Sequence, residues 1–172
     1  MKPYGLGILG IAVSLLLLTS SVLGASTELH IVLYAEDGFT ILNETTIDYR
    51  WMEQHLPVRG DGSTHYYLQG PVFVDDSEER WNPEEDANIL DKDMGAVKGT
   101  DLRDLCELVG GMEPGDTVTL RAADGFSKMF AYENVYEPTA RQGAMVIAWY
   151  HANQSYVPGY ADGMRLVFLA DT

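Results

Sequence analysis

Histidine and aromatic residues gather in two short stretches that lie far apart along the chain. The first stretch, residues 65–67, reads His-Tyr-Tyr, and the second, residues 149–151, reads Trp-Tyr-His. Aromatic rings with a few polar groups suit ligand capture, so we expect both stretches to line one pocket. Independent surface or strand-end histidines are the alternative. The candidate pocket comprises His65, Tyr66, Tyr67, Asp124, Trp149, Tyr150, Tyr160 and Arg165.

The sequence carries none of the local motifs that mark common catalytic sites. Its four histidines form no HExxH motif or other close pairing. There is no G-x-S-x-G elbow, no Walker A motif and no G-x-G-x-x-G after a strand. Carboxylates are too numerous to nominate a general acid and base. Arg165, within an apolar strand pattern, either forms an internal salt bridge or recognises an anion. We therefore assign no catalytic residues.

Cys106 is the single cysteine of the chain, so an internal disulfide and a thiolate cluster are both excluded. It falls on the apolar stripe of a predicted helix. Free cysteine is among the most buried residue types, so we expect a small buried side chain. A redox or nucleophilic role is the alternative.

The chain is strongly acidic, with a formal net charge of −15. Such a surface repels phosphate backbones, which argues against nucleic acid as a partner. It suits cations, basic partners or a high-salt habitat; a small molecule or a surface protein is the expected partner. Residues 75–93 are the most acidic stretch and predict either a solvated loop or a calcium site. The candidate calcium ligands are Asp75, Asp76, Glu84, Glu85 and Asp86.

Residues 1–24 have the outline of a secretory signal peptide. Lys2 precedes an apolar run at residues 5–18, and small residues follow, with cleavage expected after Gly24 or Ala25. An uncleaved membrane anchor is the alternative, because the apolar stretch is just long enough to span a bilayer. We therefore expect a secreted protein, or one on the extracellular face of the membrane. Asn43 and Asn153 head N-x-S/T sequons and are candidate glycosylation sites.

The best-specified local structure is a helix and hairpin in residues 98–135. Thr100 is predicted to cap a helix whose apolar stripe ends at Val109, before a glycine stop. Strands at residues 117–122 and 126–132 flank the turn signal Asp124-Gly125.

Upstream, a hairpin at residues 28–42 precedes a helix over residues 47–55, capped by Thr45 or Thr46. Residues 58–70 are expected to form a loop, and residues 71–74 a short strand. Downstream, residues 144–150 predict a central strand buried on both faces, and residues 164–170 a last strand.

These elements predict an α+β fold with a mixed, mostly antiparallel β-core and two or three short helices. The expected parts are the signal peptide or anchor (1–24), an N-terminal hairpin and helix (25–74), an acidic loop (75–94) and a helix-hairpin-strand core (95–172). A buried-looking strand so near the end predicts that the core continues in a longer protein.

Three segments resemble the molybdopterin-binding oxidoreductase domain of the sulfite oxidase type. They are K-G-T-D-L-R-D-L-C at 98–106, T-V-T-L-R-A-A-D-G-F-S-K at 117–128 and G-M-R-L-V at 163–167. That family shows a G-x-x-L-x-x-L-L helix, a strand–D-G–strand hairpin and a closing G-x-P-x-R-L-V strand. The likeness spans residues 95–170. Residues 64–71 and 141–150 also resemble exported proteins of methane-producing archaea that carry this domain.

The resemblance implies the fold and, in active family members, a molybdopterin cofactor whose metal is held by a cysteine in a loop before the helix. Here residues 75–95 contain no cysteine, and Met164 stands in place of the proline of the closing strand. We therefore expect an exported, non-catalytic ligand-binding or cell-surface module on this fold. The alternatives are a molybdopterin-dependent oxidoreductase and a calcium-stabilised surface protein.

Overall fold

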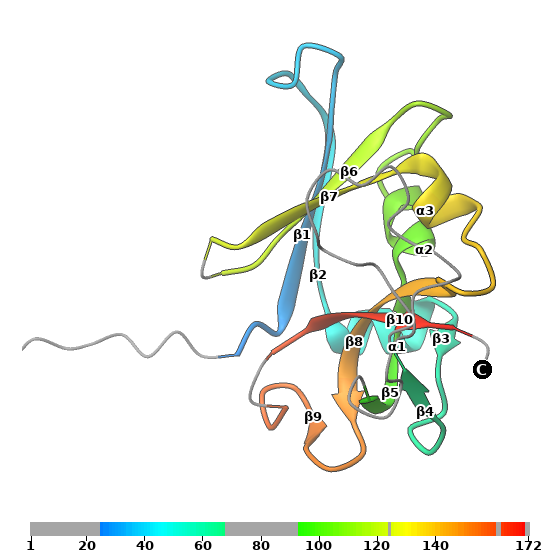
Figure 1. Cartoon of the computed structure of the whole chain (residues 1–172). Helices are drawn as coiled ribbons and strands as arrows, with labels where there is room; N and C mark the ends of the chain where they lie inside the picture. Colours follow the sequence, from blue (N-terminus) through cyan, green and yellow to red (C-terminus); the bar gives the residue numbers. More distant parts are fainter. Residues whose placement is uncertain (1–24, 68–92, 124, 161–162, 171–172) are drawn as a thin grey trace, which may run out of the picture.

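The main sheet of the computed structural model is antiparallel, with strand order β10-β8-β5-β3 (Figure 1). The structure describes residues 25–67, 93–123, 125–160 and 163–170. Two further short strands join the sheet, because β4 pairs with β5 and β9 pairs with β8. The bounds of these strands are β3 Val58–Arg59, β4 His65–Tyr67, β5 Asp93–Asp101, β8 Ala144–His151, β9 Ser155–Tyr156 and β10 Arg165–Leu169.

Two hairpins form separate two-stranded sheets. The first joins β1 (Glu28–Tyr34) to β2 (Ile41–Asp48), and the second joins β6 (Thr117–Arg121) to β7 (Ser127–Ala131). Figure 1 shows the β1–β2 hairpin projecting away from the end of the molecule that carries β4 and β9. At its base Leu29, Ile31 and Ile47 pack against the core, so the base of the hairpin is anchored in the domain.

Among the described residues, three short helices connect the strands, and each follows a strand directly. They are α1 (Tyr49–His55), α2 (Leu102–Glu107) and α3 (Tyr132–Tyr136). The Asp48 carboxylate accepts the Trp51 amide at 2.8 Å and so caps α1. Asp101 accepts the Arg103 amide at 3.0 Å and caps α2 in the same way. An aspartate side chain is a strong N-cap because it satisfies an amide that has no partner within the helix.

These caps correct two predicted helix starts. Thr45 and Thr46 lie in β2, and Thr100 lies in β5, so none of them caps a helix. In both places the strand runs on to the aspartate, and the helix begins at the next residue. The predicted loop at residues 58–70 contains the short strands β3 and β4, which pair with β5. A two- or three-residue strand has too little periodicity to be recognised from sequence.

Strand β8 is the centre of the core. It pairs with β5 on one side and β10 on the other, and Met145 to Trp149 are all buried. Gly99 allows the close approach of β5, because a Cβ there would collide with the Ile147 carbonyl oxygen. The predicted central strand is thus confirmed, as is the α+β class with mostly antiparallel strands and three short helices. Within the described parts of the chain, no helix has the length and apolar character that crossing a bilayer requires.

Candidate functional site

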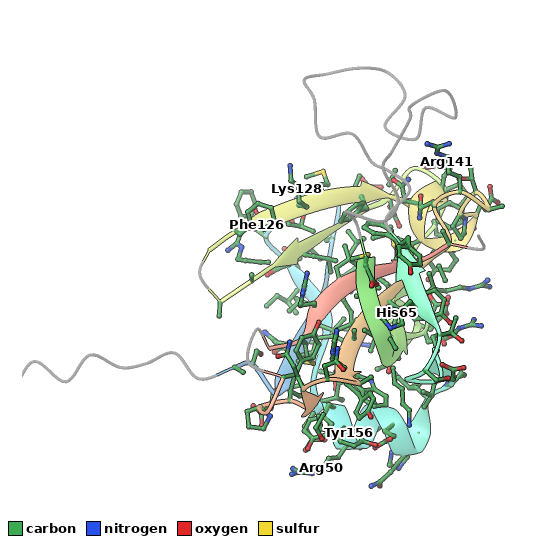
Figure 2. The ribbon with its side chains drawn as sticks, turned by 60° about the horizontal axis from the view of Figure 1, so that its bottom comes forward. Arg50, His65, Phe126, Lys128, Arg141 and Tyr156 are labelled. Atoms are coloured by element: carbon green, nitrogen blue, oxygen red, sulfur yellow. The ribbon has the colours of Figure 1, made fainter. Side chains whose placement is uncertain are left out.

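The structure brings together only part of the predicted polar-aromatic pocket. His65 on β4 lies opposite Ala96, and His151 on β8 lies opposite Val97, so both histidines flank β5. A side chain at Gly95 would collide with the imidazole of His151, which shows how closely that ring covers β5. Figure 2 shows His65 and Tyr156 at separate places on this end of the molecule. The two predicted stretches are therefore neighbours across β5.

Two of the predicted pocket residues belong to the core. Trp149 and Tyr160 are both 0% exposed. The Trp149 indole N–H donates to the Thr100 hydroxyl at 3.1 Å, and the Tyr160 ring lies 5.4 Å from that of His151. A side chain without solvent exposure cannot line an open pocket, which corrects the expectation for these two residues. Sequence did not separate them from half-buried Tyr66, Tyr67 and Tyr150, because residue type alone does not show which aromatic side chains the tertiary packing buries.

The remaining predicted residues are dispersed. Tyr66 and Tyr67 are half-buried on β4, and Arg165 is exposed on β10. Tyr150 is half-buried between Lys98, whose Nζ lies 5.1 Å from its ring centre, and Tyr156, whose ring centre lies at 4.9 Å. Asp124 lies outside the described residues.

His65 and Asp93 form a hydrogen-bonded pair at the surface. Its Nδ1 lies 2.8 Å from Asp93 Oδ2, while Oδ1 accepts the Gly95 amide at 2.7 Å. Partial desolvation raises the pKa of Asp93. The hydrogen bonds from Gly95 and His65 together lower this pKa by a larger amount, so the net shift is downward. Both side chains are more than a third exposed. Such a pair contributes little free energy and holds β4 against the start of β5.

Cys106 is buried on the inward side of α2, as the sequence predicts. Burial, with nearby Glu107 and Asp101, raises the pKa of its thiol to about 11. A protonated thiol inside the core does not fit the thiolate ligand that molybdenum has in the resembling family. The candidate calcium ligands, residues 75–86, lie outside the described residues, as does the predicted leader. Among the residues with described positions, no group of three His, Cys, Asp or Glu side chains could hold a metal ion.

Both sequon asparagines are exposed. The Asn43 side-chain amide donates to the Val109 carbonyl at 3.0 Å, which ties β2 to the chain after α2. Asn153 lies in the turn between β8 and β9, and its backbone amide donates to His151 Nδ1 at 3.2 Å. Their positions are compatible with modification, and glycosylation remains a prediction.

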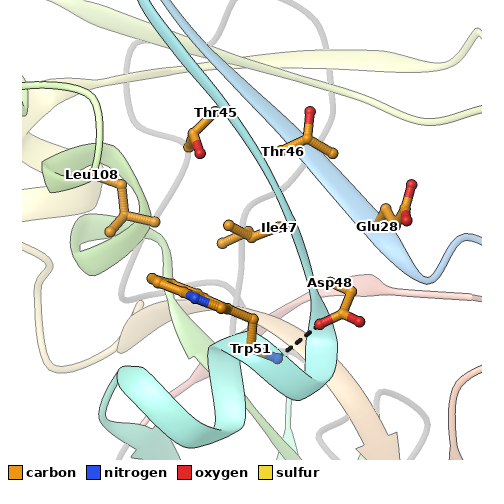
Figure 3. Close-up of a pocket in the computed structure, with 7 residues that line it drawn as sticks. All are labelled: Glu28, Thr45, Thr46, Ile47, Asp48, Trp51 and Leu108. Atoms are coloured by element: carbon orange, nitrogen blue, oxygen red, sulfur yellow. Dashed lines mark hydrogen bonds between the residues drawn. The ribbon is translucent and has the colours of Figure 1, made fainter.

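A hollow of about 500 Å³ opens at the base of the β1–β2 hairpin (Figure 3). We call it the hairpin hollow. Strand β2, helix α1 and the end of α2 contribute most of its wall, and β1 contributes one residue. Its lining residues are Glu28, Thr45, Thr46, Ile47, Asp48, Trp51 and Leu108.

The hollow has an apolar part and an acidic part. Figure 3 shows the side chains of Ile47, Trp51 and Leu108 close to one another, with the Glu28 and Asp48 carboxylates beyond β2. One face of the Trp51 indole is stacked on the His55 ring at 4.6 Å with an angle of 13° between the planes. That stack, with the backbone bond to Asp48, fixes the position of the indole.

The charges that line the hollow are all negative. Glu28 and Asp48 are paired across β1 and β2, which places both carboxylates at the same level of the hairpin. The helix cap uses Asp48 Oδ1 only, at 2.8 Å from the Trp51 amide. None of the seven lining residues is Lys or Arg. A hollow lined by an indole and by two carboxylates can attract organic cations, through the ring face and through charge.

The hairpin hollow cannot be recognised from local sequence patterns. Glu28 and Asp48 are twenty residues apart, and only the register of the hairpin places them opposite each other. Asp48 and Trp51 fall in the helix predicted for residues 47–55, and Glu28 falls in the hairpin predicted for residues 28–42. Nothing in these separate predictions places the three residues around one hollow.

No protein-family model, curated protein or solved structure matches this chain. The resemblance to molybdopterin-binding domains therefore stays a prediction. The site has to be interpreted from its own geometry.

Proposed function

We propose that this protein is an exported ligand-binding module that takes an organic cation in the hairpin hollow. The ligand group is an ammonium or a guanidinium group, carried by a small molecule or by a Lys or Arg side chain. The observation that carries the proposal is the hollow itself, whose lining includes the Trp51 indole and the Glu28 and Asp48 carboxylates. The net charge of −15 supports it, since a negative surface raises the local concentration of cations.

The affinity for an isolated cation should be weak. A cation over the half-buried indole gains roughly 0.5–1 kcal/mol, and each exposed ion pair contributes roughly 0.2–1 kcal/mol. Together these terms amount to about 0.9–3 kcal/mol, which corresponds to a dissociation constant between roughly 6 mM and 0.2 M. The hollow then acts as one contact of a larger ligand, with further contacts outside it supplying the rest of the affinity.

A ligand-binding role agrees better with Cys106 than the alternative oxidoreductase role does. The resembling enzymes hold their metal with a cysteine thiolate, whereas the thiol of Cys106 is buried, with a pKa raised to about 11. The hollow lies on a different part of the molecule and includes no residue of the predicted polar-aromatic pocket. Ligand binding therefore stays the proposed function, and its site is the hairpin hollow instead of the predicted polar-aromatic pocket.

Titration with acetyl-arginine amide, followed by protein NMR, tests the proposal. Asp48→Asn is the most informative variant, because asparagine also caps helices and the charge alone is lost. We expect Asp48→Asn and Glu28→Gln each to weaken binding severalfold. Glu36→Gln is the matched control, since it removes the same charge at the far end of the hairpin.

Two outcomes would reject the hollow as the site. One is equal weakening by Glu36→Gln and Glu28→Gln, which would mean that only the net charge matters. The other is unchanged binding in Trp51→Leu, because the indole face is the part of the site that distinguishes it from a general acidic surface.

A further inference from the structure

The tip of the β1–β2 hairpin exposes large apolar side chains. Four of the seven exposed large hydrophobic residues in the described chain are here: Tyr34 at 49%, Phe39 at 87%, Ile41 at 49% and Leu42 at 62%. We call these four residues the hairpin tip. Single exposed apolar residues are ordinary, but four on one projection form the kind of patch that marks an interaction surface.

The loop that carries Phe39 is held in shape by its own hydrogen bonds. Asp37 accepts the amides of Phe39 and Thr40, each at 2.8 Å, and the Thr40 hydroxyl at 2.6 Å. The Ala35 amide donates to the Thr40 carbonyl at 2.8 Å and closes the loop. The loop backbone at Phe39 is therefore held in place, which lowers the backbone entropy lost when a partner binds.

Leu42 lies at an irregularity in the pairing of β1 with β2. The register passes from Leu33 opposite Asn43 to Tyr34 opposite Ile41, which leaves Leu42 as the extra residue of a β-bulge. Bulges redirect a side chain and increase the local twist. Below the bulge, the Asn43 bond to the Val109 carbonyl anchors the hairpin to the domain. The tip thus lies beyond the part of the hairpin that is anchored to the rest of the domain.

The charge around the tip restricts the kind of surface that can bind to it. Residues 25–49 contain five carboxylates and no Lys or Arg, and two of the carboxylates, Glu36 and Asp37, lie in the tip loop itself. Another, Glu44, is paired with His30 at 2.9 Å. An anionic membrane and a second copy of this acidic chain would both be repelled. A surface that combines apolar contacts with Lys or Arg is complementary to it.

We infer that the hairpin tip docks into an apolar groove bordered by Lys or Arg residues on a partner protein. Phe39 and Leu42 enter the groove, and Glu36 and Glu44 meet its basic border. Asp37 holds the loop in shape through its hydrogen bonds and is not part of the inferred contact with the partner. The tip and the hairpin hollow are separate surfaces, so either can bind if the other does not.

The test uses a peptide that carries the inferred partner chemistry. The probe is two repeats of Lys-Leu-Ala-Lys-Leu-Ala-Lys, an amphipathic helix former with an apolar face and basic flanks. Its control replaces every Lys by Glu. We expect the full mature chain to bind the lysine peptide and not the glutamate peptide, with affinity falling as salt increases.

The variants locate the binding. Phe39→Ser and Leu42→Ser should each raise the dissociation constant about tenfold, the effect typical of a central apolar contact. Phe126→Ser is the matched control, because Phe126 is also exposed (63%) but lies on the β6–β7 hairpin (Figure 2). Circular dichroism spectra and melting temperatures close to wild type would show that the variants fold.

Several results would overturn the inference. One is failure to bind the lysine peptide, and another is equal loss of binding in Phe126→Ser and Phe39→Ser. A wild-type dimer that Phe39→Ser dissociates, seen by sedimentation, would assign the tip to a second copy. Phe39-dependent binding to phosphatidylglycerol vesicles would assign it to a membrane. Loss of peptide binding in Asp48→Asn, with tip variants unchanged, would place the peptide in the hollow.

Discussion

The buried hydrogen bond between Trp149 and Thr100 provides a quantitative test of the core. The Trp149 indole N–H donates to the Thr100 hydroxyl at 3.1 Å, and both residues are 0% exposed. Thr100→Val replaces the hydroxyl by a methyl group of nearly the same shape. The substitution therefore leaves no cavity and removes only the hydrogen-bond acceptor of the indole.

The expected loss follows from burial. A buried donor left without an acceptor costs about 1–3 kcal/mol, because it has given up its bond to water. For a domain of this size, each kcal/mol lowers the melting temperature by roughly 2–4 °C. Thr100→Val should thus melt several degrees below the wild type. The same exchange at exposed Thr46 on β2 should change stability by less than about 0.5 kcal/mol.

Denaturant unfolding, followed by tryptophan fluorescence and by circular dichroism, measures both variants. A double-mutant cycle with Trp149→Phe isolates the bond: in that background Thr100→Val should lose much of its effect. Equal stability of Thr100→Val and Thr46→Val would refute the reasoning. So would full additivity in the cycle, since both results mean that the two side chains do not interact.

Three further predictions concern the packing and the titratable groups. Gly99→Ala should destabilise by about 1–3 kcal/mol, because the new methyl would also lie 2.5 Å from Val146 Cγ1; a gain in stability would contradict this close strand crossing. Cys106 should not react with a thiol reagent at pH 8 until the chain unfolds. Its folded pKa of about 11 exceeds the ordinary 9.0, so stability should fall as pH rises above about 9, and less so in Cys106→Ala. Asp93 has a folded pKa below its ordinary 3.8, so its contribution is present above pH 3.8 and is lost as pH falls further; Asp93→Asn should remove part of that acid dependence.

Periodicity was sufficient to predict the longer elements. The continuous apolar run at residues 144–150 predicted a strand buried on both faces, and β8 is the central strand of the sheet. The stripe that contains Cys106 predicted its burial. The predicted helix starts were wrong because Thr100 and Thr46 are good caps by residue type, whereas the strands continue to the next aspartate. Strand pairing, which lies outside local sequence preference, decided the boundary.

The candidate site was less accessible to sequence reasoning. The two aromatic stretches lie on strands that both pair with β5, but the burial of Trp149 depends on the strands and helices that pack around β8. The hairpin hollow depends on the pairing of Glu28 with Asp48 and on the position of α1 relative to the hairpin. Both are long-range features. The exposed hairpin tip is likewise invisible in the sequence, where Phe39 to Leu42 has the pattern of an ordinary short strand.

The central claim is that the hairpin hollow recognises positive charge, and one NMR titration tests it most directly. The wild-type protein is titrated in parallel with acetyl-arginine amide and with acetyl-citrulline amide, which has nearly the same shape without the charge. We predict that the Trp51 indole N–H resonance shifts in a saturable way with the arginine compound only. Equal shifts with both compounds, or a Trp51 resonance that neither compound moves, would contradict the account.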